Sequence, residues 1–284
     1  MAALRAAEEE FYLNEVREDG SRLQHVPLTR RSMQLSVAAV RQTPMAWPFV
    51  PDRLKIEVAL ALVREDGLSL QHLPDELRTR QVVVAASVEQ NPLSLQHAAE
   101  WLEIAVDDLE LDDVLMSAVG LNGLALQYVP DNLIHPLMAL EAVGQNGLAL
   151  KFVPAKCIDR GCRFEEPHVT VDRLMLTAVR QNGLALRHVP AARINRDIAL
   201  AAVRQNGLAL RYVPAALRRD MAVMLAAVQQ NGHALQYIER DRQYRNVIEQ
   251  ALWQNDAAVM HVADNHLRHQ LLWQPAWRHA APAA

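Results

Sequence analysis

The sequence predicts an all-α fold: an α-solenoid of about ten repeats of roughly 24 residues, each a helix, a sharp turn and a shorter helix. Residues 178–190 (AVRQNGLALRHVP) and 202–214 (AVRQNGLALRYVP) differ at one position and lie 24 residues apart. The valine of this motif, or its equivalent, recurs through almost the whole chain, from Val16 to Leu252. Because one repeat cannot bury its own apolar face, successive repeats are expected to stack into a curved rod.

The first element of each repeat is predicted to be a helix that packs on both sides. In residues 198–205 the apolar positions span roughly 200° of a helical wheel, which suits a helix inside a stack. Ser32, Asn195 and Asp220 are predicted helix caps, and Pro136 suits a first helical turn. No repeat alternates apolar and polar residues over the length of a strand, so strands are not expected.

The turn and the short helix follow from an Asn-Gly or Asp-Gly dipeptide. We expect the glycine to adopt the left-handed conformation that ends a helix, and the preceding Asn or Asp to cap the next short helix, such as 208–212. A proline seven residues after the glycine is expected to end that short helix in most repeats. The dipeptide occurs at 19–20, 66–67, 122–123, 146–147, 182–183, 206–207 and 231–232.

The domain organisation predicted from this pattern is a single solenoid domain over residues 1–284. Longer intervals between repeats place insertions near 99–112 and 155–171. The tail, residues 264–284, carries Trp273 and Trp277 and is expected to cap the last repeat, with a docking segment as the alternative.

Composition and charge narrow the class of protein. A hydrophobic content of 51% with 22% charged residues is typical of a folded, soluble protein, and the net charge of −4 gives no general reason to expect nucleic acid. The chain has no apolar run of about 18 residues, so no membrane span is expected. Two cysteines favour a reducing intracellular compartment, either the cytoplasm or an organelle reached by a targeting peptide since removed.

The repeat motif A-V-x-x-N-G-x-A-L-x-x-V-P resembles that of a tandem-repeat domain-of-unknown-function family, number four-one-one-six. Its N-G-L-A-L core occurs at 122–126, 146–150, 182–186 and 206–210. The resemblance implies the helical-repeat architecture. It implies no activity, because the family has no assigned activity and no catalytic motif.

No catalytic residue is predicted, because the sequence lacks the hydrolase, nucleotide-binding and metalloprotease motifs. A row of His, Tyr and Phe occupies the fifth position after the glycine, and packing with a polar tip is the favoured interpretation. Layers about 10 Å apart are too widely spaced to supply ligands at about 2.0–2.1 Å from one zinc ion. The row comprises His25, Phe49, His72, His97, Tyr128, Phe152, His188, Tyr212, Tyr237 and His261.

The second insertion carries Cys157, Cys162 and His168 beside Glu165 and Glu166. A loop without a special role is the favoured interpretation, and a disulfide or a zinc site remain the alternatives, although the spacing is not that of common zinc fingers. We therefore predict no metal and no cofactor.

Charge patterning gives the candidate binding residues. A basic strip is predicted from residues at equal repeat positions, namely Lys151, Arg180, Arg187, Arg204 and Arg211. The first insertion is acidic and is a second candidate, with Asp107, Asp108, Glu110, Asp112 and Asp113. Either set could instead be a solvated face that keeps the rod soluble.

The function predicted from these features is a non-catalytic helical-repeat scaffold for protein–protein interaction, which acts alone or as a subunit of a larger assembly. The expected partner is another protein of unknown identity, and a homo-oligomer or complex subunit is consistent with the same surface. The alternative is a helical-repeat protein that binds nucleic acid, which the acidic insertion and the net charge oppose.

Overall fold

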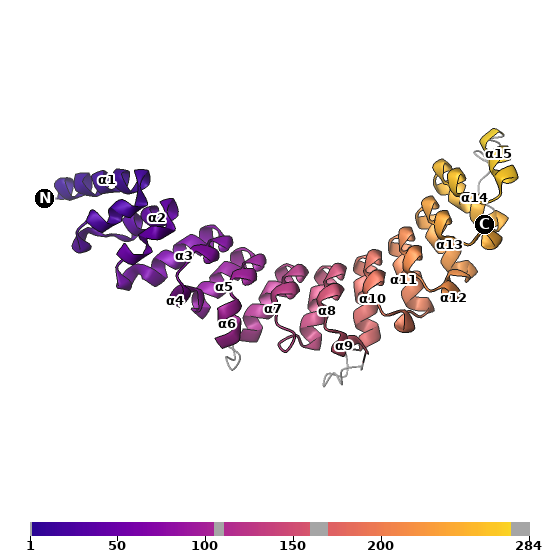
Figure 1. The fold of residues 1–284 in the computed structure, drawn as a ribbon, viewed down its shortest axis with the longest axis horizontal. Helices are drawn as coiled ribbons and strands as arrows, with labels where there is room; N and C mark the ends of the chain where they lie inside the picture. The colour runs from indigo at the N-terminus through magenta and orange to yellow at the C-terminus, as the bar shows by residue number, and fades with distance from the viewer. Residues whose placement is uncertain (1, 105–110, 160–169, 274–284) are drawn as a thin grey trace. The chain divides into compact units, whose positions relative to one another are not determined.

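A computed structural model describes residues 2–104, 111–159 and 170–273. Every regular element in these ranges is an α-helix or a 3₁₀ helix, and none is a strand, which confirms the all-α prediction (Figure 1). No helix among the described residues is both long and apolar enough to cross a bilayer. The chain divides into two compact parts, Met1–Pro130 and Asp131–Ala284, which are described separately.

In both parts a long helix is followed directly by a six-residue 3₁₀ helix, and we call this combination a helix pair. The elements of the N-terminal part are α1 (Ala2–Glu18), η1 (Gly20–His25), η2 (Leu28–Arg30), α2 (Met33–Gln42), η3 (Pro44–Phe49), η4 (Asp52–Leu54), α3 (Lys55–Glu65), η5 (Gly67–His72), α4 (Asp75–Arg78), α5 (Gln81–Gln90), η6 (Pro92–His97), α6 (Ala99–Ile104), α7 (Leu111–Leu121) and η8 (Gly123–Tyr128).

The C-terminal part continues the same order. Its elements are α8 (Pro136–Gln145), η9 (Gly147–Phe152), α9 (Ala155–Asp159), α10 (Val171–Gln181), η10 (Gly183–His188), η11 (Ala191–Arg193), α11 (Arg196–Gln205), η12 (Gly207–Tyr212), α12 (Ala215–Arg218), α13 (Met221–Gln230), η13 (Gly232–Tyr237), η14 (Arg240–Arg242), α14 (Arg245–Gln254), η15 (Asp256–His261) and α15 (Asn265–Trp273).

The pair α11–η12 shows how the sequence produces this local structure. Asn195 caps α11, since its side chain accepts a hydrogen bond from the backbone N–H of Ile198 at 2.9 Å. After α11, Asn206 is extended (φ −149°, ψ 108°), and its side chain caps η12 by accepting from the N–H of Leu208 at 3.0 Å. The predicted cap is therefore confirmed. The short helix is a 3₁₀ helix, which ends before Val213 and the proline that follows it.

The left-handed glycine expected in this turn is not found. Gly183 is the first residue of η10 and does not adopt a left-handed backbone. Glycine is required there for a different reason: a Cβ atom on Gly183 would lie 2.4 Å from the carbonyl oxygen of Ala202 in α11. The prediction was wrong because the constraint comes from the neighbouring helix pair and not from the local backbone.

A glutamine at the end of the following long helix secures this close approach. The Oε1 atom of Gln205 accepts a hydrogen bond from the backbone N–H of Gly183 at 2.5 Å. Its Nε2 atom donates to the backbone carbonyl of Gln181 at 3.3 Å. The two backbone groups lie where α10 ends and η10 begins, and no bond within either helix satisfies them. We call this pair of hydrogen bonds the glutamine clasp.

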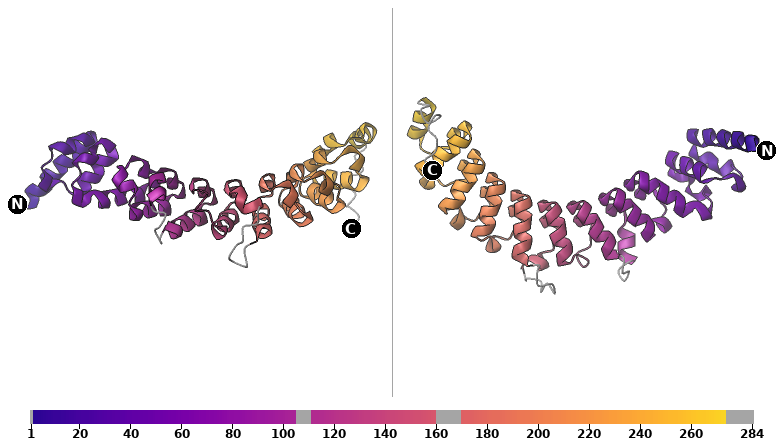
Figure 2. Two further views of the ribbon diagram at one scale, coloured as in Figure 1. Left: turned by 60° about the horizontal axis from the view of Figure 1, so that its bottom comes forward. Right: turned by 180° about the vertical axis from the view of Figure 1, so that it is seen from behind.

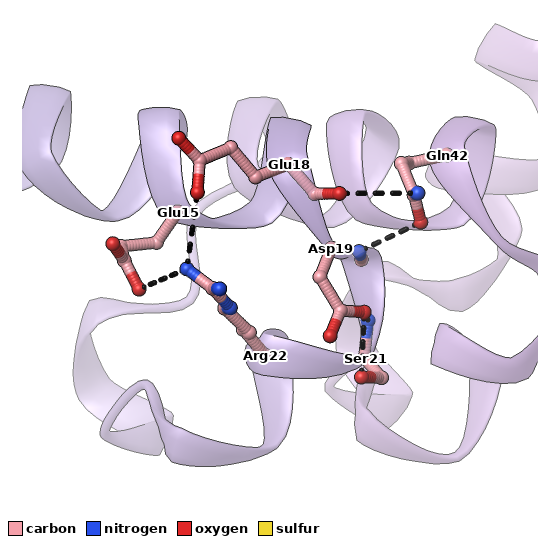
Figure 3. Close-up of polar contacts among 7 residues, drawn as sticks. Glu15, Glu18, Asp19, Ser21, Arg22 and Gln42 are labelled. Carbon is pink, nitrogen blue, oxygen red and sulfur yellow. Dashed lines mark hydrogen bonds and ion pairs between the residues drawn. The ribbon is translucent and has the colours of Figure 1, made fainter.

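The same clasp recurs in both parts of the chain. Figure 3 shows the first one, in which Gln42 bridges the carbonyl of Glu18 and the N–H of Gly20. Among the described residues, the glutamines that form a clasp with the preceding helix pair include Gln42, Gln90, Gln181, Gln205, Gln230 and Gln254.

Two interfaces of the N-terminal part have a proline where the glycine would stand, and both lack the glutamine. Pro44 and Pro92 have no N–H to donate, and the following helices carry Glu65 and Leu121 at the clasp position. Glu65 instead forms an ion pair with Arg41. A pocket lies at this first interface, and the indole N–H of Trp47, one of its lining residues, is buried without a hydrogen-bond partner in the described structure.

The core of each part consists of small and branched apolar side chains shared between neighbouring pairs. In the pair α11–η12, Ala202, Val203, Ala209 and Leu210 are completely buried. Helix α11 contacts both α10 and α13, and these helices lie side by side in Figures 1 and 2. The wide apolar arc predicted for this helix is therefore used on both of its sides.

The predicted insertions and tail are only partly described. Helix α6 begins the first insertion and α9 begins the second, while residues 105–110 and 160–169 lie outside the described ranges. Helix α15 forms the start of the tail and contacts η15. Trp277 lies outside the described residues, so capping by the tail stays a prediction.

Two alanine substitutions should have opposite effects on stability. Gly183→Ala should lower the free energy of unfolding by about 1–3 kcal/mol, because the new methyl group collides with the carbonyl of Ala202. Gly144→Ala should raise it by about 0.5–1 kcal/mol, because Gly144 is an exposed glycine inside α8 whose nearest neighbour would be 3.9 Å away. Urea denaturation of both variants measures the difference, and equal stabilities would contradict the close-approach argument.

The clasp can be tested with adjacent residues. Gln205→Ala should lower the free energy of unfolding by roughly 1–2 kcal/mol, because the N–H of Gly183 loses its acceptor. Arg204→Ala is the matched control and should change stability by less than about 0.5 kcal/mol, since this exposed side chain forms no ion pair with the described residues. If the two variants unfold at the same urea concentration, the clasp contributes nothing measurable.

Candidate interaction surface

Three residues of the predicted basic strip occupy the same place on consecutive 3₁₀ helices. Lys151, Arg187 and Arg211 are the fifth residues of η9, η10 and η12, and all three are exposed. These 3₁₀ helices contact one another in order, η9 with η10 and η10 with η12. The C-terminal part therefore carries a basic row, which we define as Lys151, Arg187 and Arg211.

Each cation of the basic row lies against the ring that follows it in sequence. The Nζ atom of Lys151 lies 5.3 Å from the centroid of the Phe152 ring, and the guanidinium carbon of Arg211 lies 4.6 Å from that of Tyr212. Both rings are half-buried, and each of these two cations lies over one ring face. Cation–π contacts of this kind hold a flexible side chain in place. At an exposed site each contact stabilises the structure by about 0.5–1 kcal/mol.

The middle member of the basic row contacts a histidine. Arg187 donates from Nε to Nε2 of His188 at 2.8 Å. The pKa of His188 is lowered, first by burial and then by the positive charges of Arg187 and Lys151. The histidine is therefore held neutral and able to accept this bond, and the effect of Lys151 shows that neighbouring members of the row act on the same ring.

The other two residues of the predicted strip lie on different elements. Arg180 and Arg204 are the next-to-last residues of α10 and α11, and both are exposed. Arg204 borders a shallow hollow lined by Ala222, Leu225 and Gln229 of α13. The strip thus consists of two rows, one on the 3₁₀ helices and one at the ends of the long helices.

None of the five strip residues forms an ion pair with any described residue, in contrast to other arginines of the same part. Arg196 contacts Asp220 at 2.7 Å, and Arg219 contacts Glu239 at 3.0 Å. Both of these ion pairs connect one helix pair to the next. The fold therefore neutralises some of its exposed arginines and leaves the strip, within the described structure, without acidic partners.

The predicted acidic insertion is only partly described. Asp112 and Asp113 are exposed in the first turn of α7, where negative charge is favourable beside the positive end of the helix dipole. Asp107, Asp108 and Glu110 lie outside the described residues. The described pair is accounted for by its position at a helix N-terminus.

The predicted row of rings is half-buried at most positions and exposed at His25 and His72. Burial is also the main cause of the lowered pKa values of His97 and His261. No group of three or more metal-ligating side chains occurs among the described residues. Cys157 is buried in α9, whereas Cys162, Glu165, Glu166 and His168 lie outside the described ranges.

Sequence analysis missed two arrangements. The glutamine clasp was hidden because its partners are backbone atoms of another repeat, although the loss of the glutamine where Pro44 and Pro92 replace glycine was a usable signal. The contact between His233 and His261 at 3.1 Å was also missed. Its signal was N-G-H-A-L at 231–235, which differs at one position from the N-G-L-A-L motif of the other Asn-Gly repeats.

Comparison with known protein families gives a match for two segments of the chain. The model of a domain of unknown function, DUF4116, matches residues 56–103 and 195–241, which confirms the resemblance at these segments. Each match spans two consecutive helix pairs, α3–η5 with α5–η6 and α11–η12 with α13–η13. Arg204 and Arg211 lie inside the second match, and Lys151, Arg180 and Arg187 lie outside it. Among curated proteins and solved structures, none matches the chain.

Proposed function

We propose that this chain, in which residues 56–103 and 195–241 match DUF4116, is a non-catalytic helical-repeat scaffold that binds another protein. In this proposal the helix pairs form an α-solenoid of about ten repeats, which acts alone or as a subunit of a larger assembly. The observation that carries the proposal is the basic row, three exposed cations on consecutive 3₁₀ helices without acidic partners in the described structure.

A docking role accounts for the basic row better than a solvated face does. Arg196 and Arg219 lie on the same part of the chain and obtain acidic partners from the next helix pair. The row is equally exposed, and its side chains are held on ring faces at Phe152 and Tyr212. Ordered cations lose less conformational entropy when they bind a carboxylate, which favours an acidic protein surface as partner.

A nucleic-acid partner, the alternative, is less well supported by the same contacts. Proteins that bind single strands stack bases on open aromatic faces beside a basic groove. Here Lys151 and Arg211 already lie over the rings of Phe152 and Tyr212 and compete with a base for stacking. The net charge of −4 also provides little long-range attraction for a polyanion.

Replacing Lys151, Arg187 and Arg211 together by alanine should weaken binding of a fluorescent polyglutamate peptide by roughly 10- to 100-fold at low ionic strength. Three exposed charge pairs at about 0.5–1 kcal/mol each correspond to this loss. Fluorescence anisotropy measures the affinity, and thermal unfolding should show a nearly unchanged Tm because the three residues are exposed.

The matched control also removes three positive charges, but from arginines that already form ion pairs with acidic residues. The variant Arg196→Ala, Arg219→Ala, Arg245→Ala breaks pairs with Asp220, Glu239 and Glu249, and it should bind polyglutamate within about threefold of the parent. Equal affinities of both variants would reduce the row to a solvated face. Binding of homopolymeric RNA without binding of polyglutamate would favour the nucleic-acid alternative.

A further inference from the structure

One contact between the last two helix pairs is unlike those between the other described helix pairs. His233 occupies the second position of η13, where most repeats have leucine, and His261 occupies the last position of η15. The Nδ1 atom of His233 lies 3.1 Å from the Nε2 atom of His261. The rings meet edge to face, with their centroids 5.3 Å apart and their planes at 74°.

The capping residue Asn255 fixes the direction of the hydrogen bonds. Its Oδ1 atom accepts from the backbone N–H of Ala257 at 2.9 Å, so its Nδ2 atom faces His233. Nδ2 can only donate, and it lies 3.1 Å from Nε2 of His233. His233 must therefore carry its proton on Nδ1 and donate it to Nε2 of His261. The chain of donors runs from Ala257 through Asn255 and His233 to His261.

We propose that His233 and His261 form a pH-sensitive latch that holds η15 on η13 at neutral pH and weakens when either ring takes up a proton. This device lies outside the basic row and does not depend on the proposed function.

A proton added to either histidine ring would point at a hydrogen-bond donor that already occupies that side of the ring. A proton on Nε2 of His261 would face the N–H of His233, and a proton on Nε2 of His233 would face the amide of Asn255. One proton therefore breaks at least one of the two bonds. Two protons would also bring like charges together in rings whose centroids are 5.3 Å apart.

Burial determines the direction of the response. The pKa of His261 is lowered, first by burial and then by His233. A histidine whose pKa is lower in the folded than in the unfolded state contributes its full stability above about pH 6.5 and loses it as the pH falls below that value. The latch is therefore closed at neutral pH and opens on acidification.

Other ionisable groups near the pair do not account for this effect. Among the described groups, His233 alone acts electrostatically on His261. The elements packed against η13 and η15 carry Arg211, Tyr212, Tyr237, Arg245, Glu249, Asp256, His266, Arg268 and His269. Gln243 links the same elements through an amide that does not titrate. It donates to the carbonyls of Leu235 and His261 and accepts from the N–H of Ala263. Opening is thus expected to loosen η15 without detaching it.

Hydrogen exchange of the full chain between about pH 7.5 and about pH 5.5 tests the latch. After correction for intrinsic exchange, the amides of η15 should exchange faster at the lower pH than those of η12, by up to about tenfold per pH unit for each proton taken up. Helix η12 is an internal reference, because it has Leu208 and Tyr212 at the two positions concerned.

The double variant His233→Leu, His261→Tyr supplies the matched control. It installs the residue types of the preceding interface, Leu208 and Tyr237, and is expected to fold and to lose the pH response of η15. A pH response that persists in the variant would overturn the proposal, as would the absence of one in the parent. Protection of η15 by added Zn²⁺ in the parent alone would also overturn it, since the pair would then be a metal site.

Discussion

The close approach of a long helix to the glycine of the preceding helix pair is the constraint on which most of the described interfaces depend. At Gly183 the backbone comes so near the carbonyl of Ala202 that a single methyl group does not fit. At such a distance the first N–H of the 3₁₀ helix cannot reach water, and it needs a protein acceptor. Gln205 provides this acceptor and also binds the last carbonyl of the preceding helix. Packing and hydrogen bonding thus set the same spacing.

The interfaces without glycine show that the two requirements belong together. Where Pro44 and Pro92 remove the N–H, the clasp glutamine is replaced by Glu65 and Leu121. A glutamine retained there would place its carbonyl oxygen against a proline nitrogen that has no N–H to donate. The first of these interfaces also contains the indole N–H of Trp47, which is buried and has no hydrogen-bond partner among the described residues.

The sequence was sufficient for features that a residue carries within its own repeat. The helix, the Asn206 cap and the apolar arc of α11 depend on neighbours within a few residues, and their letters recur along the chain. It was insufficient for Gly183, because a left-handed turn and a close contact both call for glycine and only the distance to Ala202 distinguishes them. For the same reason the clasp role of Gln205 was not predicted, because its partners are the backbone atoms of Gly183 and Gln181 in another repeat.

The candidate surface consists of positions whose residue type the packing between helix pairs does not constrain. The clasp position keeps glutamine along the C-terminal part, at Gln181, Gln205, Gln230 and Gln254. The position immediately before it varies, from Arg180 and Arg204 to Gln229 and Trp253. The packing that repeats the fold leaves these side chains exposed, so their identity is not determined by stability. A partner that reads the C-terminal part would therefore be selected by such variable positions and by the basic row, while the clasps keep them at a regular spacing.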